Sequence, residues 1–270
     1  MREVISVYSL WRDSEPHIHR TLRQLEDLES LDYEFEYYFY ENDSKDNTMS
    51  ILKDWLKNRR HKFTHENLNA EKFKSTQSVE RMKFLCECRN KCKGLLQDAQ
   101  SLYTLLLDSD IEFNKNNLIQ HLNTIKQLDD CCLITPNVRQ DIPDLMYGVT
   151  EDSYYDVYPL FDSRGKKCWY FTDCPFTNGL DRMKWSLGQL IKCASAFGGF
   201  ALIKTDVLKK VKWSTDGMCD HVNFCKEIQP YGSIYLDPKN KVYAKVDESM
   251  IHMPSLRSIA NTQLKNEYLL

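Results

Sequence analysis

The sequence predicts an α/β fold in which helices cover both faces of a mostly parallel sheet. Short segments of apolar, β-branched or aromatic residues alternate with longer segments whose apolar residues recur at helical spacing. The short segments are mostly apolar, as is typical of strands buried on both faces of a sheet. This alternation favours parallel strands joined by helices, and ligands in such sheets bind at the carboxyl ends of the strands.

Predicted strands and helices alternate through residues 1–136. The strands cover residues 4–10, 35–40, 102–107 and 131–135, and the helices fall within 15–28, 49–56, 78–96 and 116–128. Glu15-Pro16 supports the first helix start, because proline is favoured in the first turn of a helix. Each strand with the helix after it forms one β-loop-α unit.

The pattern changes after Pro136. Residues 137–178 are rich in tyrosine, aspartate and proline, show few helical patterns, and are interpreted as an elaboration of the fold. Beyond them we expect a strand at 196–203, helices at 205–211 and 220–229, and two late edge strands at 234–236 and 242–244. The 270 residues contain no internal repeat and fit a single domain.

Composition limits the possible partners. Hydrophobic residues make up 42% and charged residues 28% of the chain, which are ordinary values for a globular protein. A net charge of -3 gives no overall attraction for nucleic acid, so no nucleic-acid partner is expected. No segment approaches the roughly 20 apolar residues of a membrane span, and no signal-length apolar run opens the sequence. We therefore expect a soluble, cytoplasmic protein.

The ten cysteines follow no metal-binding or redox spacing. No two of them form a Cys-x-x-Cys pair, which argues against a zinc ribbon or a thioredoxin-like site. Unpatterned cysteines in a chain of this length predict buried thiols in a reducing compartment, with a disulfide framework as the alternative.

The sharpest chemical signal is Asp108-Ser109-Asp110, directly after the third predicted strand. Side chains alternate along an extended segment, so Asp108 and Asp110 project to the same side. Two carboxylates at the end of a strand suit a hard divalent cation, Mn²⁺ or Mg²⁺, which neutralises a leaving diphosphate. A solvated turn is the alternative, and the buried strand before the motif argues against it.

Polar residues from Glu41 to Thr48 follow the second predicted strand. Asp43 is expected to accept hydrogen bonds from a base or a ribose hydroxyl. Asp46 or Asn47 is expected to cap the next helix, and capping is also the alternative for Asp43.

Two further groups are candidates for ligand contacts. Arg89 and Lys93 share one helix face that can approach a diphosphate, with a solvated face as the alternative. In Phe197-Gly198-Gly199-Phe200, the glycines allow close approach of a ligand to the backbone, and either phenylalanine can stack on a sugar ring. A packed strand with a bulge is the alternative for this segment.

Several of these motifs occur in the order found in GT-A glycosyltransferases. They are Tyr8-Ser9-Leu10, Glu41-Asn42-Asp43-Ser44-x-Asp46-x-Thr48, Cys88-Arg89-Asn90, Asp108-Ser109-Asp110, Phe197-Gly198-Gly199-Phe200 and Cys219-Asp220-His221. The chain resembles family-2-like enzymes and the small glycosyltransferases of large DNA viruses and of fungal capsule synthesis. The resemblance covers residues 1–136 and 195–252, whereas residues 137–194 match nothing known to us.

This resemblance implies a GT-A (Rossmann-like) fold with an acceptor-side elaboration, and a site with three groups of residues. The UDP- or GDP-sugar donor is expected against Tyr8, Ser9, Leu10, Glu41, Asp43, Arg89, Asp108 and Ser109, the Mn²⁺ or Mg²⁺ ion on Asp108, Asp110 and His252, and the glycan or glycoprotein acceptor on Gly198, Gly199 and His221. Asp220 is the predicted catalytic base, which takes the acceptor's proton in an inverting reaction. Residues 1–136 would form the nucleotide-sugar-binding half and residues 137–270 the acceptor-binding half.

Two other functions use the same residues. A nucleotidyl- or phosphotransferase can hold its metal-bound phosphate on the same carboxylates, although such proteins carry a glycine-rich phosphate loop after the first strand and this sequence has none there. A non-catalytic glycan-binding domain on a degenerate GT-A fold is the other alternative, and the intact pair of Asp108 and Asp110 argues against it. For a viral protein, the expected location is the host cytoplasm.

Overall fold

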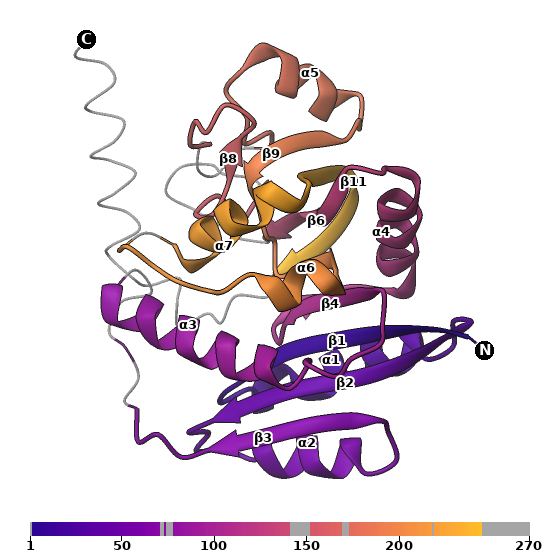
Figure 1. Ribbon diagram of the computed structural model, residues 1–270, viewed down its shortest axis with the longest axis vertical. Coiled ribbons are helices and arrows are strands. Elements are labelled where there is room, and N and C mark those ends of the chain that lie inside the picture. The colour runs from indigo at the N-terminus through magenta and orange to yellow at the C-terminus, as the bar shows by residue number, and fades with distance from the viewer. Residues whose placement is uncertain are drawn as a thin grey trace.

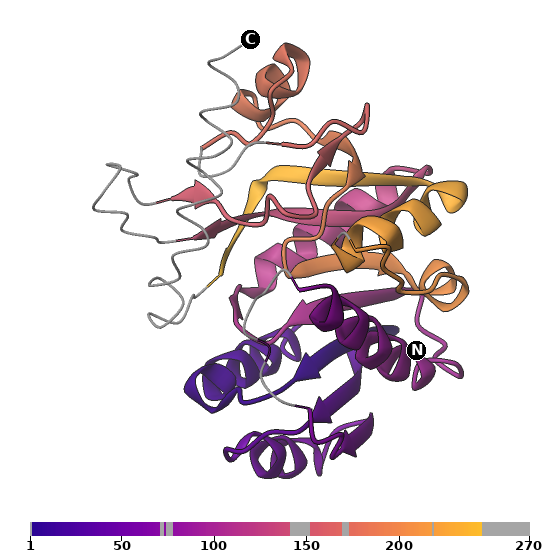
Figure 2. The ribbon, with the colours of Figure 1, turned by 90° about the vertical axis from the view of Figure 1, so that its left-hand side faces the viewer.

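The structure is a computed structural model that describes residues 2–70, 73, 78–140, 152–168, 173–217 and 219–244. One eleven-stranded sheet runs through them in the order β3-β2-β1-β4-β10-β6-β11-β9-β8, with β5 beside β11 and β7 beside β6. Figures 1 and 2 show the N-terminal elements below and the C-terminal elements above, on either side of β4. No described helix has both the length and the apolar character needed to cross a membrane.

The N-terminal half is a four-stranded parallel part of the sheet, in which a helix follows each of the first three strands. It consists of β1 (Glu3–Trp11), α1 (Glu15–Leu28), β2 (Tyr33–Asn42), α2 (Thr48–Leu56), β3 (His61–Glu66), α3 (Val79–Gly94) and β4 (Tyr103–Asp108). All the pairings among β3, β2, β1 and β4 are parallel. The predicted β-loop-α units are confirmed, and β3 is an addition that the polar segment at 61–66 did not reveal.

Helices cover both faces of this half, as alternate residues of β1 show. Tyr8 stacks on Trp213 with ring centroids 5.5 Å apart and donates a hydrogen bond of 2.9 Å to the carbonyl oxygen of Arg89 in α3. Trp11 points to the other face, where it packs on Phe39 beside α2. Figure 1 shows α3 in front of the sheet and α1 behind it. With both faces covered, β1 and β4 consist mostly of buried residues, whereas β3 at the edge is polar and only partly buried.

The C-terminal half continues the same sheet with mixed pairing. Its elements are β5 (Ile111–Glu112), α4 (Lys115–Gln127), β6 (Cys131–Gln140), β7 (Ser153–Tyr154), β8 (Phe161–Asp162), α5 (Gly179–Ser186), β9 (Ile191–Ser195), β10 (Phe200–Lys204), α6 (Thr205–Lys210), α7 (Asp220–Ile228), a 3-10 turn at Gln229–Tyr231 and β11 (Ser233–Ala244). Because β10 lies antiparallel between β4 and β6, the two halves share one continuous sheet.

The two late edge strands were predicted wrongly, because they are parts of one interior strand. β11 runs from Ser233 to Ala244 and pairs with β6 on one side and with β9 on the other. Its register against β6 shifts between Asp237 and Lys241, and Pro136 of β6 lies opposite Asp237. Proline has no N–H for the ladder, so it is tolerated beside this irregularity, and β6 continues past Pro136 where the sequence predicted its end.

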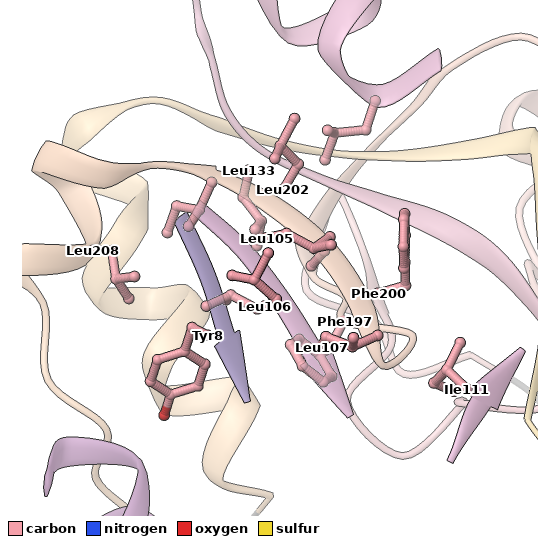
Figure 3. Close-up of a cluster of buried hydrophobic side chains, with 14 of the residues drawn as sticks. Tyr8, Leu105, Leu106, Leu107, Ile111, Leu133, Phe197, Phe200, Leu202 and Leu208 are labelled. Carbon is pink, nitrogen blue, oxygen red and sulfur yellow. The ribbon is translucent and has the colours of Figure 1, made fainter. Parts of the chain in front are cut away.

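The strand predicted at 196–203 begins later, at Phe200. Gly198 and Gly199 have φ values of +74° and +65°, which belong to a turn rather than to a strand. β10 then pairs with β4 from Phe200 opposite Leu107 to Lys204 opposite Tyr103. Figure 3 shows Phe197, Phe200 and Leu107 together among the buried side chains of the core, with Leu107 at the end of β4.

The elaboration after residue 137 is tied to the sheet by a buried arginine. Arg139 at the end of β6 donates hydrogen bonds of 2.9 Å to Asp152 and 2.6 Å to Asp173, and it is only 1% exposed. Two carboxylates therefore compensate the buried guanidinium charge, as a buried ion requires. The described part of this segment includes β7 and β8, and α5 and β9 follow it, so the strands β7, β8 and β9 widen the sheet.

The carboxylate of Asp46 joins the loops after β1 and β2 by hydrogen bonds. Asp46 accepts hydrogen bonds of 3.0 Å from the N–H of Glu15 and 2.9 Å from the N–H of Thr48, the first residues of α1 and α2. Glu15 accepts a hydrogen bond of 3.1 Å from the N–H of Asn47 in return. The prediction is confirmed only in part: the N-cap residue of α2 is Asn47, which makes no side-chain cap hydrogen bond, and Asp46, one position earlier, accepts the first N–H group of both helices.

Asp46→Ala tests this shared cap. We expect the free energy of unfolding to fall by about 1–2 kcal/mol, the usual effect of losing an N-terminal cap, as measured by urea denaturation. Asp54→Ala is the matched control, since Asp54 is an exposed aspartate of α2 that forms an ion pair with Lys57, its one ion-pair partner among the described residues. Equal losses in the two variants would contradict the shared cap.

Candidate active site

The Asp108-Ser109-Asp110 turn lies at the carboxyl end of β4, beside the end of β1. Asp108 is in register with Leu10 of β1. Helix α1 holds the turn by its backbone: Thr21 donates a hydrogen bond of 2.6 Å to the carbonyl of Ser109, and Arg20 donates one of 2.9 Å to the carbonyl of Asp110. The turn is therefore fixed without using either carboxylate.

The two carboxylates concentrate negative charge. Burial, together with the charges of Asp108 and Asp156, raises the pKa of Asp110 to about 6, against the opposing charge of Arg20. A carboxylate crowded by other carboxylates is stabilised by a cation that it can share with them. Oxygen donors on a fixed turn suit Mn²⁺ or Mg²⁺, so the donor set fits the predicted metal.

Arg89 of α3 joins the metal turn to α7. Its Nε donates a hydrogen bond of 2.8 Å to Oδ2 of Asp220, and its guanidinium lies 3.8 Å from Oδ1 of Asp108. The side chain is 8% exposed. Burial opposes its charge, but Asp220 and Asp108 outweigh burial and raise the pKa of Arg89, which keeps a fixed positive charge beside the turn.

Both carboxylate oxygens of Asp220 already have partners. Oδ2 is bound to Arg89, and Oδ1 lies 3.3 Å from Nδ1 of His221. Burial opposes its charge, yet His221 and Arg89 hold the pKa of Asp220 well below its ordinary value. Asp220 is also only 2% exposed. This geometry supports a role in positioning Arg89, and the catalytic role of Asp220 stays a prediction.

Cys219, Asp220 and His221 place three potential ligand atoms within 4.8 Å of one another. All three residues are buried, and Asp220 has Arg89 as its ion-pair partner. A cation there would lie next to the guanidinium group. Because the same guanidinium also lies 3.8 Å from Asp108, this proximity does not decide between the two groups, and the metal role of Asp108 and Asp110 stays a prediction.

The predicted acceptor residues form the turn that faces the metal site. Gly199 accepts a hydrogen bond of 2.9 Å from the N–H of Asp108, and a β-carbon on Gly199 would meet Ile111 at 2.6 Å. Only glycine fits this position, because it also has a positive φ. Phe197 precedes the turn and stacks on His221 with ring centroids 3.8 Å apart. The structure thus brings Gly198, Gly199 and His221 together.

Asp156 is a member of this site that the sequence did not reveal. It follows β7 in the elaboration, and its Oδ2 accepts a hydrogen bond of 2.8 Å from the N–H of Gly198. Burial, with smaller contributions from the charges of Asp108 and Asp220, raises the pKa of Asp156 to about 6, against the charge of His221 and the hydrogen bond from Gly198. No spacing marked this residue, since it stands in a segment with many tyrosines and aspartates and no recognised motif.

The residues predicted to contact the nucleotide lie around the ends of β1 and β2. Tyr8 is buried and serves the packing under Arg89, Ser9 is buried, and Leu10 lies beside Asp108. Glu41 is fully buried, accepts a hydrogen bond of 3.0 Å from the N–H of Ser44 and contacts His65. These contacts shape the loop, and a direct contact with the nucleotide stays a prediction for each residue.

Asp43 organises the neighbouring loop. Its carboxylate accepts hydrogen bonds of 2.8 Å each from the N–H of Asn69 and the side chain of Asn42. Burial opposes the charge, but these hydrogen bonds lower the pKa of Asp43. Ser109 also has protein partners. Its hydroxyl oxygen lies 3.3 Å from the hydroxyl oxygen of Ser14 and 3.3 Å from Nε2 of His17. His252 lies outside the described residues.

Comparison with solved structures identifies the architecture. The first 349 residues of S. aureus TarS in complex with UDP superpose with a TM-score of 0.54 and 16% identity, over 92% of this chain and 61% of that one. The mannosyltransferase PcManGT from Pyrobaculum calidifontis, in complex with GDP-Man and Mn²⁺, has a TM-score of 0.54 and 12% identity, over 92% of this chain and 58% of that one. The chain has a GT-A fold.

These likenesses support the GT-A fold and nothing finer. No known protein family matches the sequence, and no curated protein is significantly similar to it. The chain spans about 60% of the length of the TarS fragment, which also binds UDP-GlcNAc in a further structure with a TM-score of 0.51. The resemblance to viral and fungal enzymes stays a prediction.

Asp110→Asn tests the charge repulsion at the metal turn. Folding raises the pKa of Asp110 from 3.8 to about 6, so ionising Asp110 destabilises the metal-free fold as the pH rises through that window. We expect the variant to unfold at a higher temperature than the wild type at about pH 7, with most of the difference gone at about pH 4. Added Mn²⁺ should raise the unfolding temperature of the wild type more than that of the variant. The exposed Asp129→Asn is the control, and a variant less stable than the wild type at both pH values would contradict the repulsion.

Proposed function

We propose that the protein is a metal-dependent glycosyltransferase that moves a sugar from a UDP- or GDP-sugar to a hydroxyl group of a glycan or glycoprotein. Asp108 and Asp110 hold Mn²⁺ or Mg²⁺, and Arg89 stabilises the diphosphate. The observation that carries this proposal is the Asp108-Ser109-Asp110 turn on a GT-A sheet, with a buried arginine beside it.

The fold and the charges of the site support this proposal together. The turn lies where the parallel strands β1 and β4 end, which is the ligand-binding edge of such sheets. The structures most useful for comparison bind UDP, or GDP-Man with Mn²⁺. A diphosphate and a divalent cation together would compensate both the carboxylates of the turn and the charge of Arg89.

The residues divide the chemistry between the two sides of the site. A bound metal ion supplies Lewis-acid stabilisation of the leaving diphosphate. Arg89 is held ready by Asp220 and needs no rearrangement to contact a diphosphate oxygen. The turn at Gly198 and Gly199 leaves the backbone open to an acceptor. A carboxylate on the acceptor side can take a proton from the attacking hydroxyl, and this supports inversion at the anomeric carbon.

The proposal extends to the location and organisation of the protein. All ten cysteines lie in described residues and are free thiols, and nine of them are buried. This supports a reducing compartment such as the cytoplasm. We also propose one domain, with residues 1–136 mainly for the donor and residues 137–270 mainly for the acceptor, because the loops that meet at the site come from both.

The decisive experiment measures nucleotide release from a panel of UDP-glucose, UDP-galactose, UDP-GlcNAc and GDP-mannose, with Mn²⁺, Mg²⁺ or EDTA. We expect one donor to release its nucleotide only with metal, through slow transfer to water. Asp110→Ala should lower this rate by at least about 10²-fold while the protein stays folded, because metal binding contributes several kcal/mol to the transition state.

Asp129→Ala is the control for that variant, since Asp129 is exposed and follows α4, at the other end of β6 from the site. An active, metal-independent Asp110→Ala variant would contradict the proposed role of the turn. Release of pyrophosphate from a nucleoside triphosphate, without turnover of any sugar donor, would instead establish the phosphotransfer alternative.

A further inference from the structure

Two carboxylates lie beside the acceptor turn, and their surroundings differ. Asp220 begins α7, and Asp156 follows β7 in the segment that resembles no known family. Both lie close enough to His221 for its charge to lower their pKa values. Only a carboxylate with a free oxygen can take a proton from an acceptor hydroxyl, so their hydrogen bonds distinguish the two.

Asp220 has no oxygen to spare. Arg89 binds one oxygen at 2.8 Å and His221 lies 3.3 Å from the other, where the thiol of Cys219 also lies at 3.6 Å. An acceptor hydroxyl would have to displace one of these partners from a residue that is 2% exposed. Displacing Arg89 would leave a buried charge without its partner, which is strongly unfavourable.

Asp156 has one oxygen held and one open. Its Oδ2 accepts the N–H of Gly198, which anchors the carboxylate against the turn. Within the described ranges, no group donates a hydrogen bond to Oδ1, and this atom is not among the fully enclosed polar atoms that lack a partner. The backbone at this point is fixed, because Tyr155 donates its N–H to the carbonyl of Val138 at 3.0 Å.

The glycine turn connects Asp156 with the metal turn. Asp156 accepts the N–H of Gly198 at 2.8 Å, and the next residue, Gly199, accepts the N–H of Asp108 at 2.9 Å. The charge of Asp156 acts on Asp110, and the charges of Asp108 and Asp220 act on Asp156. Its pKa of about 6 is near the value at which a carboxylate is both ionised at neutral pH and basic enough to accept a proton. It therefore has the location, the open oxygen and the basicity that the step requires.

We propose that Asp156 is the residue that accepts the proton of the attacking hydroxyl, and that Asp220 positions Arg89 and His221 without touching the acceptor. This inference rests on the proposed function. As the hydroxyl oxygen bonds to the anomeric carbon, its proton passes to Oδ1 of Asp156. The bond from the anomeric carbon to the diphosphate oxygen breaks at the same time, and its electron pair leaves with the nucleoside diphosphate.

The test uses the full chain and the donor that the wild type hydrolyses in the panel. Asp156→Asn should lower nucleotide release to water by about 10²- to 10⁴-fold, the usual contribution of a general base. Donor affinity and Mn²⁺ affinity should stay at wild-type values. Azide brings an electron pair without a proton, so it needs no base, and sodium azide should restore most of the lost rate and yield a glycosyl azide detectable by mass spectrometry.

Two further variants separate chemistry from positioning. Asp156→Glu keeps a carboxylate and should retain part of the rate to water without azide. Asp220→Asn should lose rate through the displaced Arg89, so azide should not restore it. A merely structural role for Asp156 would lower the unfolding temperature and would not respond to azide.

Three outcomes would overturn the inference. Wild-type rates in Asp156→Asn would exclude a proton acceptor at this position, while the proposed function would stand. Weakened Mn²⁺ binding in the same variant would make Asp156 a metal ligand, and restoration of Asp220→Asn by azide would return the role to Asp220. If the wild type turns over no donor, the proposed function fails first and this inference falls with it.

Discussion

The buried ion pair between Arg89 and Asp220 is the constraint on which the site depends. It joins α3, which packs on the N-terminal strands, to α7, which packs on the C-terminal ones, and it brings the guanidinium group to Asp108. Removing one member of a buried pair typically costs about 3–5 kcal/mol, because the other charge remains buried. This ion pair therefore fixes α3 and α7 relative to each other at the point where a diphosphate and an acceptor would meet.

This pair also explains how negative charge is distributed around the site. Asp220 has Arg89 at 2.8 Å and His221 at 3.3 Å, whereas Asp108 has Arg89 at 3.8 Å, and the positive charges that act on Asp110 and Asp156 are those of Arg20 and His221. The pKa values of Asp110 and Asp156 rise to about 6 as a result of burial and of this crowding. Repulsion between these carboxylates lowers the stability of the ligand-free fold. Binding of a cation and a phosphate would relieve this repulsion.

The sequence predicted the residues whose position follows from their own strand or helix. It missed the elements whose position depends on pairing with distant strands. Asp108 and Asp110 were found because a buried strand ends at them, and Asp46 because helix starts have a known chemistry. The strand β3 has little apolar character, and it becomes a strand only because β2 offers it a parallel edge. The interior position of β11 depends on β9, which lies about 40 residues away along the chain and had no predicted strand of its own.

Asp156 in the candidate active site likewise could not be predicted from the sequence, because its position depends on strands that are distant along the chain. Its two-residue strand, β7, is too short to carry a pattern, and it exists because Arg139 and Gln140 at the end of β6 provide a partner. The sequence did not predict that end of β6, because Pro136 indicated the end of the strand. The place of Pro136 in the sheet depends on the irregular register of β11. Two strand pairings, β6 with β7 and β6 with β11, must therefore be known before Asp156 can be placed beside Gly198. The proposed proton acceptor can in this way arise in a segment without any motif, because the sheet fixes its position, and burial, more than the surrounding charges, raises its pKa.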